Sequence, residues 1–445
     1  MNFEALNVLL EEKKYNEFIP LINSLNHVDI ADFLQQLSDI PLYKVFRMLK
    51  KDIAADVFAE LDSEFQQQII DSMKDSEISS FIDTLAMDDT VNMLEEFPAN
   101  VVDRILKSTA PELRKEINRF LKYPEGSAAS VMTSEFVRIK SHFTVAEAVS
   151  YIRKTGIDKE TVYVIYVTDS SRKLLGIVEL KDLLFSAEDA TIESIMDSAV
   201  ISASTHDDQE TVANMISKYD LLALPIVDSE SRLVGIVTVD DALDVISEEA
   251  TEDIEKMGAI VPSDKPYLKI GVFETWLKRI PWLLVLMISA AFTGSIITHY
   301  ESALAQVVIL TAFIPMLMGS GGNAGGQASV TIIRSLSLGE VRMGNIFRIL
   351  WKELRVSLLC GLTLSVVAFG KVMLIDRASV GVASVVALAL LSTVVLANLV
   401  GASLPILAKR IKLDPAVMAS PFITTIVDAA SLVIYFFFAT KILGL

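Results

Sequence analysis

The chain has 445 residues, of which 52% are hydrophobic and 22% charged, and its formal net charge is −18. The charge is uneven, because residues 1–270 carry 50 acidic and 26 basic residues whereas residues 271–445 carry 7 acidic and 13 basic ones. The apolar character of residues 271–445 excludes a simple soluble protein. The acidic character of residues 1–270 argues against nucleic-acid binding, because these residues would repel phosphates, and it favours the binding of small cations instead.

Residues 1–130 are predicted to form an all-α domain built from short helical repeats. The apolar segments 29–37, 52–61 and 77–85 recur about every 24 residues, and the region shows little strand pattern. Such a spacing is typical of helical arrays whose units bury their apolar faces against one another. The opening residues are charged and amphipathic, which is not the pattern of a signal peptide.

The sequence repeats itself between residues 131 and 246. A unit that ends KLLGIVELKDLL at 173–184 is followed by one that ends RLVGIVTVDDAL at 232–243. Each unit shows a short helix, an alternating apolar run, a turn, a strand around Gly-Ile-Val and a closing helix. This β-α-β-β-α order resembles a tandem pair of CBS domains, predicted at residues 131–190 and 191–246, which associate as a compact regulatory module.

CBS domains often bind adenine nucleotides through a G-h-h-T-x-x-D segment, in which h is hydrophobic. The second unit has this segment as Gly235, Thr238 and Asp241, so the resemblance implies that Thr238 and Asp241 contact ATP. In the first unit Glu179 replaces the threonine, and a carboxylate that faces a phosphate is unfavourable. Two interpretations stay open for this segment, a nucleotide site and a purely structural junction of strand and helix.

The region from Asp207 to Asp253 is strongly acidic, with 13 carboxylates opposed by only two basic side chains. Several of the carboxylates have helical spacing, and like charges on one helix face destabilise a helix by roughly a few tenths of a kcal/mol per pair. A hard divalent cation would neutralise them, and the alternative is a solvated acidic face. The helix is predicted to run to Ile270 and to lead directly into the membrane, so residues 247–271 would transmit cation binding.

Residues 272–445 are predicted to form an all-α membrane domain of five helices, since a span needs about 20 mostly apolar residues. Five successive stretches meet this requirement, three without any charge and two with one charge each. They are 280–298, 302–333, 356–375, 378–408 and 415–440. Five such stretches in succession argue against buried core helices of a soluble domain.

Basic residues at the ends of the spans predict the orientation, because they concentrate on the cytoplasmic side. One group precedes the first span, a second lies between spans two and three, and a third lies between spans four and five. They are Lys278, Arg279, Arg334, Arg342, Arg348, Lys352, Arg355, Lys409, Arg410 and Lys412. We therefore expect a multi-pass protein of the plasma membrane with its N-terminus in the cytoplasm and its C-terminus outside.

Asp428 is the one acid in the middle of a predicted span. A carboxylate at the bilayer centre costs roughly 2.5–3.5 kcal/mol on insertion scales, so it normally faces a polar pathway. The alternative is a protonated aspartate that forms a hydrogen bond between packed helices. Thr424 and Thr425 lie one helical turn earlier and would add hydroxyl and carbonyl oxygens. In the second span, residues 319–327 (GSGGNAGGQ) are small enough for close helix approach.

The order of these parts, with the segments GGNAGGQ and PFITTIVDAASLVIY, resembles the MgtE family of magnesium channels over essentially the whole chain. The resemblance implies a homodimer whose pore lies between the two chains and is lined by spans two and five. Asp428 and Thr424 of each chain would then hold a Mg²⁺ ion that keeps much of its water shell, in line with the reluctance of Mg²⁺ to dehydrate.

The resemblance also implies that cytosolic Mg²⁺ closes the pore by bridging the N-domain, the CBS domains and the connecting helix. The matching acids are Asp88, Asp208, Glu210, Asp220, Asp241, Asp244, Glu249, Glu252 and Asp253. Two positions depart from the family pattern. Asn92 stands where a second acid of the N-domain is expected, and Gly326 stands where a second asparagine often occurs.

Three functions remain open from the sequence. The first is a Mg²⁺-selective channel or transporter that imports the ion and is closed by it. The second is a membrane-anchored CBS sensor of nucleotide or ionic state that does not conduct, and the third is a CBS-regulated transporter of another solute. The acid at mid-span favours conduction of a cation, because an anchor needs no carboxylate at that depth. The chain has neither a His-Glu-x-x-His nor a Gly-Lys-Ser/Thr motif, so we do not expect an enzyme.

Overall fold

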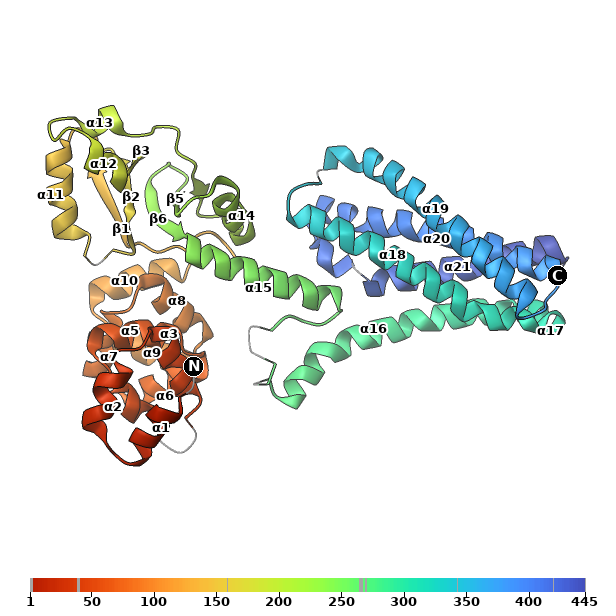
Figure 1. Ribbon diagram of the computed structural model, residues 1–445, viewed down its shortest axis with the longest axis horizontal. Coiled ribbons are helices and arrows are strands. Elements are labelled where there is room, and N and C mark those ends of the chain that lie inside the picture. Colours follow the sequence, from red (N-terminus) through yellow and green to blue (C-terminus); the bar gives the residue numbers. More distant parts are fainter. Residues whose placement is uncertain are drawn as a thin grey trace. The chain divides into compact units, whose positions relative to one another are not determined.

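The computed structural model describes residues 3–37, 41–157, 159–263, 267–268, 270–341, 343–418 and 420–444. The chain divides into two compact units, Met1–Ile246 and Ser247–Leu445, and each is described by itself (Figure 1). Arg342, one of the basic residues that predict the orientation, lies outside the described residues.

The first unit begins with a run of short helices. They are α1 (Glu4–Glu11), α2 (Tyr15–Ile22), α3 (His27–Gln35), α4 (Leu42–Phe46), α5 (Lys51–Ala59), α6 (Ser63–Ser72), α7 (Asp75–Ile82), α8 (Met87–Glu96), α9 (Ala99–Ser108) and α10 (Pro111–Phe120). The three predicted apolar segments fall on α3, α5 and α7, which confirms the helical array. Their buried faces meet neighbouring helices, and the rings of Phe58 and Phe81 pack edge to face with centroids 4.9 Å apart.

Two three-stranded sheets follow, and both have the predicted β-α-β-β-α order. The first half contains β1 (Phe136–Lys140), α11 (Val145–Thr155), β2 (Thr161–Thr168), β3 (Leu174–Glu179) and α12 (Leu180–Phe185). The second contains α13 (Ile192–Ile195), β4 (Ala203–Ser204), α14 (Gln209–Tyr219), β5 (Ala223–Val227), β6 (Leu233–Thr238) and α15 (Val239–Met257). In each sheet the first strand pairs parallel to the second and the third pairs antiparallel to it. Single bridges such as Thr133 with Ile236 join the halves.

Helix α15 ends at Met257, so the prediction of a continuous helix to Ile270 is wrong. The backbone N–H of Ile260 donates to the carbonyl oxygen of Glu255 at 2.9 Å and closes the helix end. Ala259 lies between them in the left-handed region, with φ of 55°. The left-handed conformation costs an L-residue roughly 1–2 kcal/mol and cannot be continued as a helix. The periodicity of acidic residues gave no sign of this turn.

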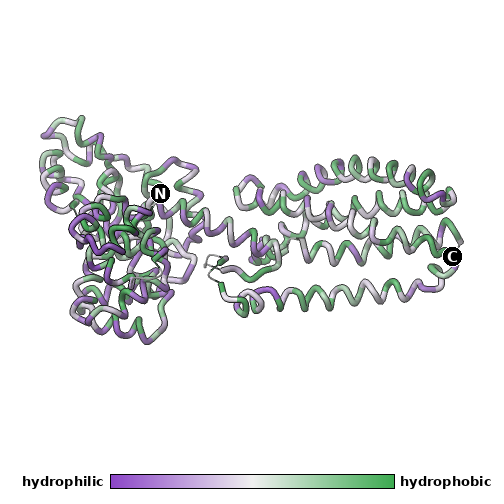
Figure 2. The backbone as a smooth tube through the Cα atoms, turned by 60° about the horizontal axis from the view of Figure 1, so that its bottom comes forward, coloured by the Kyte–Doolittle hydropathy of each residue, from purple (hydrophilic) through white to green (hydrophobic). Residues whose placement is uncertain are grey.

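The second unit contains five helices that are long and apolar enough to cross a membrane, as predicted. They are α16 (Val272–His299), α18 (Ile314–Ser337), α19 (Ile346–Leu374), α20 (Val380–Arg410) and α21 (Ser420–Leu443). Shorter segments connect them, namely α17 (Glu301–Gln306) and the 3₁₀ helices η1 (Val308–Phe313), η2 (Met343–Asn345) and η3 (Pro415–Met418). Figure 2 shows the hydrophobic residues that run along the five helices. Helix α20 packs against α18, α19 and α21, whereas α16 packs mainly on α21 and leaves most of its side chains exposed.

Candidate ion pathway and regulatory carboxylates

Asp428 lies within α21 and is half-buried. Its backbone carbonyl oxygen accepts a hydrogen bond from the Ser431 hydroxyl at 2.9 Å. Among the described residues, no side chain donates a hydrogen bond to its carboxylate and no cation pairs with it. A hydrogen bond between packed helices, the alternative role for this acid, is therefore absent from the described part of the chain. The carboxylate remains available to a cation.

The threonines of the preceding turn direct their hydroxyl hydrogens along their own helix. Thr424 and Thr425 both donate to the carbonyl oxygen of Pro421, at 2.9 and 3.1 Å. Their oxygens keep lone pairs that can accept from water or contact a cation. Because Thr424 precedes Asp428 by four residues, the two side chains lie on the same face of α21.

The glycines of α18 allow this helix to approach α21 beside Asp428. A Cβ atom at Gly322 would lie 3.0 Å from the Thr424 methyl group, and one at Gly325 would lie 2.7 Å from a methyl group of Ile423. The segment GGNAGGQ therefore acts by close helix packing, as its composition predicts. Its glycines are buried against α20 and α21, whereas Asn323 on the same helix is exposed.

Three buried polar residues of the membrane helices escaped the sequence analysis. Ser329 of α18 is 0% exposed, and Thr393 and Asn398 of α20 are 1% and 6% exposed. Their side-chain oxygens have no hydrogen-bond partner within the described residues. Burial of such a group without a partner costs on the order of 1–3 kcal/mol, so each of these positions carries an unsatisfied polar group. A search for charged residues could not find them, although a search for amides in uncharged spans would have found Asn398.

A cluster of carboxylates lies in the first unit, where α8 meets the CBS pair. Burial, followed by the charges of Asp89, Asp241 and Glu160, raises the pKa of Asp88 to about 8. Burial and the charge of Asp241 raise the pKa of Asp89 to about 6, and the same two causes raise the pKa of Glu160 to about 7. One carboxylate oxygen of Asp88 is buried and has no partner among the described residues.

This cluster joins two predicted residues, Asp88 and Asp241, to two that the sequence analysis missed, Asp89 and Glu160. Neutralisation by a hard cation would relieve the repulsion among these carboxylates, although in the described residues no three of them lie close enough to bind one ion together. Asp89 directly follows a predicted acid and could have been included. Glu160 lies just before β2, far from the acidic run, and only the fold brings it close.

Two other predicted acids of the CBS pair, Asp208 and Asp220, have local backbone roles. Asp208 caps α14, because its carboxylate accepts from the backbone N–H of Glu210 at 2.9 Å. Asp220 ends the same helix in the left-handed region, with φ of 52°. Asp244 lies one turn after Asp241 on α15. In the described part of the chain, no three Asp, Glu, His or Cys side chains lie as close together as a single metal ion requires.

In the second unit, Lys256 binds two carboxylates at the end of α15. Its Nζ lies 2.6 Å from Glu252 Oε1 and 2.6 Å from Asp414 Oδ2. Burial alone would lower the pKa of Lys256, but the hydrogen bonds that its ammonium donates to Asp414 and Glu252 outweigh burial, and the pKa is raised. Glu252, which the sequence predicts as a Mg²⁺ ligand, is thus paired with a lysine. Glu249 and Asp253 lie on the same helix.

The raised carboxyl pKa values predict how stability depends on pH. A carboxyl whose pKa is higher in the folded protein than in the unfolded one binds protons more tightly when folded, so stability rises as pH falls. With a chelator present, Asp88→Asn should raise the melting temperature at pH 9, where wild-type Asp88 is charged. The difference should vanish only below about pH 3, where Asp88 is protonated in the unfolded chain, whose ordinary pKa is 3.8, as well as in the folded one. Asp83→Asn, at an exposed position, is the control, and parallel melting curves for all three proteins at every pH would contradict the cluster.

Comparison with known families agrees with this organisation. Residues 314–438 match the MgtE family, described as a divalent cation transporter, and residues 25–126 match the MgtE intracellular N domain. Residues 128–189 and 192–248 each match the CBS domain.

Similar proteins extend over nearly the whole chain. It is 35% identical over 435 residues to the magnesium transporter MgtE of Thermus thermophilus, which covers 97% of this chain and 96% of the relative. It is 33% identical to the magnesium transporter MgtE of Bacillus subtilis, with 97% and 95% covered. The crystal structure of the soluble part of a magnesium transporter matches 56% of this chain and 98% of that chain, with 32% identity and a TM-score of 0.52. The cytosolic domain of the Mg²⁺ channel MgtE in complex with ATP matches 54% and 98%, with 32% identity and a TM-score of 0.51.

Proposed function

This chain belongs to the MgtE family of magnesium transporters, and from that premise we propose that it carries Mg²⁺ into the cell past Asp428 and closes when cytosolic Mg²⁺ rises. The observation that carries the proposal is the half-buried carboxylate of Asp428, which has no hydrogen-bond or ion-pair partner among the described residues. A structural acid at this depth would be paired. A cation that passes through supplies the missing charge.

The ion pathway is proposed to form between two copies of the chain, each of which contributes Asp428 and Thr424. One carboxylate balances half of the charge of Mg²⁺. A two-fold arrangement of two chains would supply the second carboxylate, from Asp428 of the other copy. Mg²⁺ loses water reluctantly, and a site of two carboxylates with threonine oxygens can bind the ion through its water shell. The proposal places the N-terminus in the cytoplasm, in line with the basic residues that flank the spans.

Closure is proposed to follow from Mg²⁺ binding to the carboxylates of the first unit and of α15. The proposed regulatory ligands are Asp88, Asp208, Glu210, Asp220, Asp241, Asp244, Glu249, Glu252 and Asp253, and the pKa values add Asp89 and Glu160. Each bound ion removes repulsion that the buried cluster otherwise carries. The ion can shift the gating equilibrium only by its difference in affinity between the closed and open states.

The nucleotide proposal concerns Thr238 and Asp241 and is supported by the relative whose cytosolic domain was crystallised with ATP. The Thr238 hydroxyl donates to the Asp241 carboxylate at the start of α15. A bound ribose would compete for the same oxygen. Thr238→Val should therefore alter the affinity for ATP measured by calorimetry, and an unchanged affinity would remove this segment from the nucleotide site.

The test of the proposed function is Mg²⁺ flux into liposomes that contain the purified protein, compared with a variant that lacks residues 1–130. The full chain should conduct and should close as internal Mg²⁺ rises. The truncated chain should conduct but close less readily, because the bridges through α8 are lost. Absence of flux in both proteins would favour the membrane-anchored sensor, and identical closure curves would exclude the helical array from gating.

Lys256→Met should shift the Mg²⁺ dependence of closure. Removal of the ammonium leaves Glu252 and Asp414 facing each other and releases the end of α15, so the internal Mg²⁺ concentration at half closure should change several-fold. Asp414→Asn should act on the same contact, so the double variant should show less than the sum of the two effects. Lys352→Met, which replaces an exposed lysine of α19, should leave the curve in place. Strict additivity would show that the contact takes no part in gating.

A further inference from the structure

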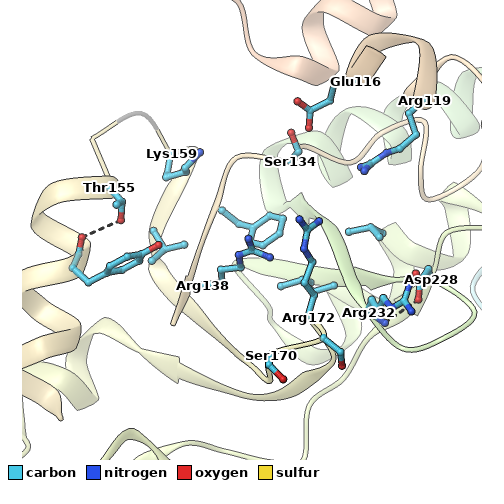
Figure 3. Close-up of a pocket in the computed structure, with 16 residues that line it drawn as sticks. Glu116, Arg119, Ser134, Arg138, Thr155, Lys159, Ser170, Arg172, Asp228 and Arg232 are labelled. Carbon is cyan, nitrogen blue, oxygen red and sulfur yellow. Dashed lines mark hydrogen bonds between the residues drawn. The ribbon is translucent and has the colours of Figure 1, made fainter. Parts of the chain in front are cut away.

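A basic pocket of about 680 Å³ lies between α10 and the two CBS halves (Figure 3). Its lining brings together five cationic side chains and two carboxylates. The cations are Arg119, Arg138, Lys159, Arg172 and Arg232, and the carboxylates are Glu116 and Asp228. This surplus of positive charge is notable in a region where acids outnumber bases by 50 to 26.

The fold collects the cations from distant parts of the first unit. Arg119 comes from α10 and Arg138 from β1, whereas Arg172 and Arg232 come from the β2–β3 and β5–β6 turns. The two turns are joined by backbone hydrogen bonds, among them that from the N–H of Leu233 to the carbonyl oxygen of Arg172 at 3.0 Å. The pocket is therefore built from both CBS halves and closed on one side by a helix of the N-domain.

Most cations of the pocket have no ion-pair partner within the described residues. Asp228 Oδ1 accepts from the backbone N–H groups of Glu230 and Arg232, each at 2.9 Å, and is used to form the turn. Arg232 pairs with Glu230. Within the described residues, none of Arg119, Arg138, Lys159 and Arg172 forms an ion pair. Four cations that line one pocket without ion-pair partners repel one another, and the two lining carboxylates leave a net positive charge that an entering anion would neutralise.

The shape and chemistry of the lining select the class of anion. Guanidinium groups bind phosphate oxygens through paired N–H donors, and several converging on one cavity suit a chain of phosphates better than a single charge. Tyr151 and Phe136 also line the pocket, and they offer aromatic surface to a base. Thr238 and Asp241 are not among the lining residues, so this site is separate from the nucleotide segment of the second CBS unit.

We propose that this pocket binds a polyphosphate anion, either inorganic or as part of a nucleotide. The anion contacts Arg119 on α10 and the two CBS turns at once, and so it ties the N-domain to the CBS pair. Anion binding at this pocket does not depend on ion conduction, so it can be tested independently of what the membrane domain transports.

Calorimetry on the purified full chain in detergent, with a chelator to remove divalent ions, tests the proposal with tripolyphosphate and with ATP as probes. Tripolyphosphate should bind, and Arg119→Gln and Arg172→Asn should each weaken binding about tenfold. Asparagine is chosen at position 172 because the residue has φ of 70°, which asparagine tolerates. Arg153→Gln, on the exposed side of α11, is the matched control and should bind as the wild type does.

The two sources of polyphosphate are separated by the second probe. Equal affinity for both probes would show that the phosphate chain is sufficient, whereas much tighter binding of ATP that falls with Tyr151→Ala would show that the base is also held. Absence of tripolyphosphate binding would overturn the proposal. Tripolyphosphate binding that is unchanged in both arginine variants would also overturn the proposal. ATP binding that falls with Thr238→Val but not with Arg119→Gln would overturn it as well, because ATP would then bind at the other segment.

Discussion

Asp428→Asn should reduce Mg²⁺ flux to the level of empty liposomes while leaving the protein folded. Asparagine has nearly the same shape and keeps an oxygen, so the change removes the charge and little else. The carboxylate has no partner among the described residues, so its neutralisation breaks no ion pair there. A divalent ion at membrane depth without a counter-charge meets a barrier of several kcal/mol, and about 1.4 kcal/mol already changes a rate tenfold.

Glu301→Gln supplies the control for this prediction, because it removes a carboxylate from an exposed position at the start of α17. Its flux should equal that of the wild type. Size-exclusion chromatography and melting curves on the same preparations separate loss of flux from loss of fold. Wild-type flux through Asp428→Asn would remove this residue from the pathway, and loss of the folded protein would assign it a packing role.

Gly401→Ala should unfold or misassemble the membrane domain. A Cβ atom at this position would lie 2.2 Å from the carbonyl oxygen of Gly325, so α18 and α20 would have to separate by about an ångström. Overpacking typically costs about 1–3 kcal/mol, and a backbone atom cannot move aside as a side chain can. Because α18 also packs on α21 beside Asp428, the shift would extend to the ion pathway.

The expected result for Gly401→Ala is a lower melting temperature in detergent together with reduced flux. Gly370→Ala makes the same chemical change in α19, where a Cβ atom would have no neighbour within 4 Å. That variant should match or slightly exceed the wild type in stability, since alanine favours a helix by roughly 0.5–1 kcal/mol over glycine. Equal melting temperatures for the two variants would show that the two helices can part without cost.

The order of elements could be predicted from the sequence because each is marked by a local pattern. The helical repeats, the two β-α-β-β-α units and the five spans follow from periodicity and from the absence of charge, and Asp428 was found because a lone acid contrasts with an apolar span. The end of α15 was missed because it depends on one left-handed alanine, Ala259. The contact of Lys256 with Asp414 was missed because the two residues are 158 positions apart, and no local pattern joins them. The pairing of Lys256 with Glu252, four residues earlier on the same helix, is a local pattern and could have been predicted.

The ammonium of Lys256 is a cation that the chain itself delivers to Glu252 and Asp414. Because it is covalently attached, its concentration at this pair is fixed by geometry and not by the surrounding solution. Short tethers give effective concentrations in about the millimolar range. A dissolved cation of equal intrinsic affinity must therefore reach about that concentration before it displaces the lysine half of the time. Lys256 at the end of α15 therefore competes with dissolved cations for Glu252 and Asp414. Below about the concentration that the tether provides, dissolved cations leave this contact unchanged.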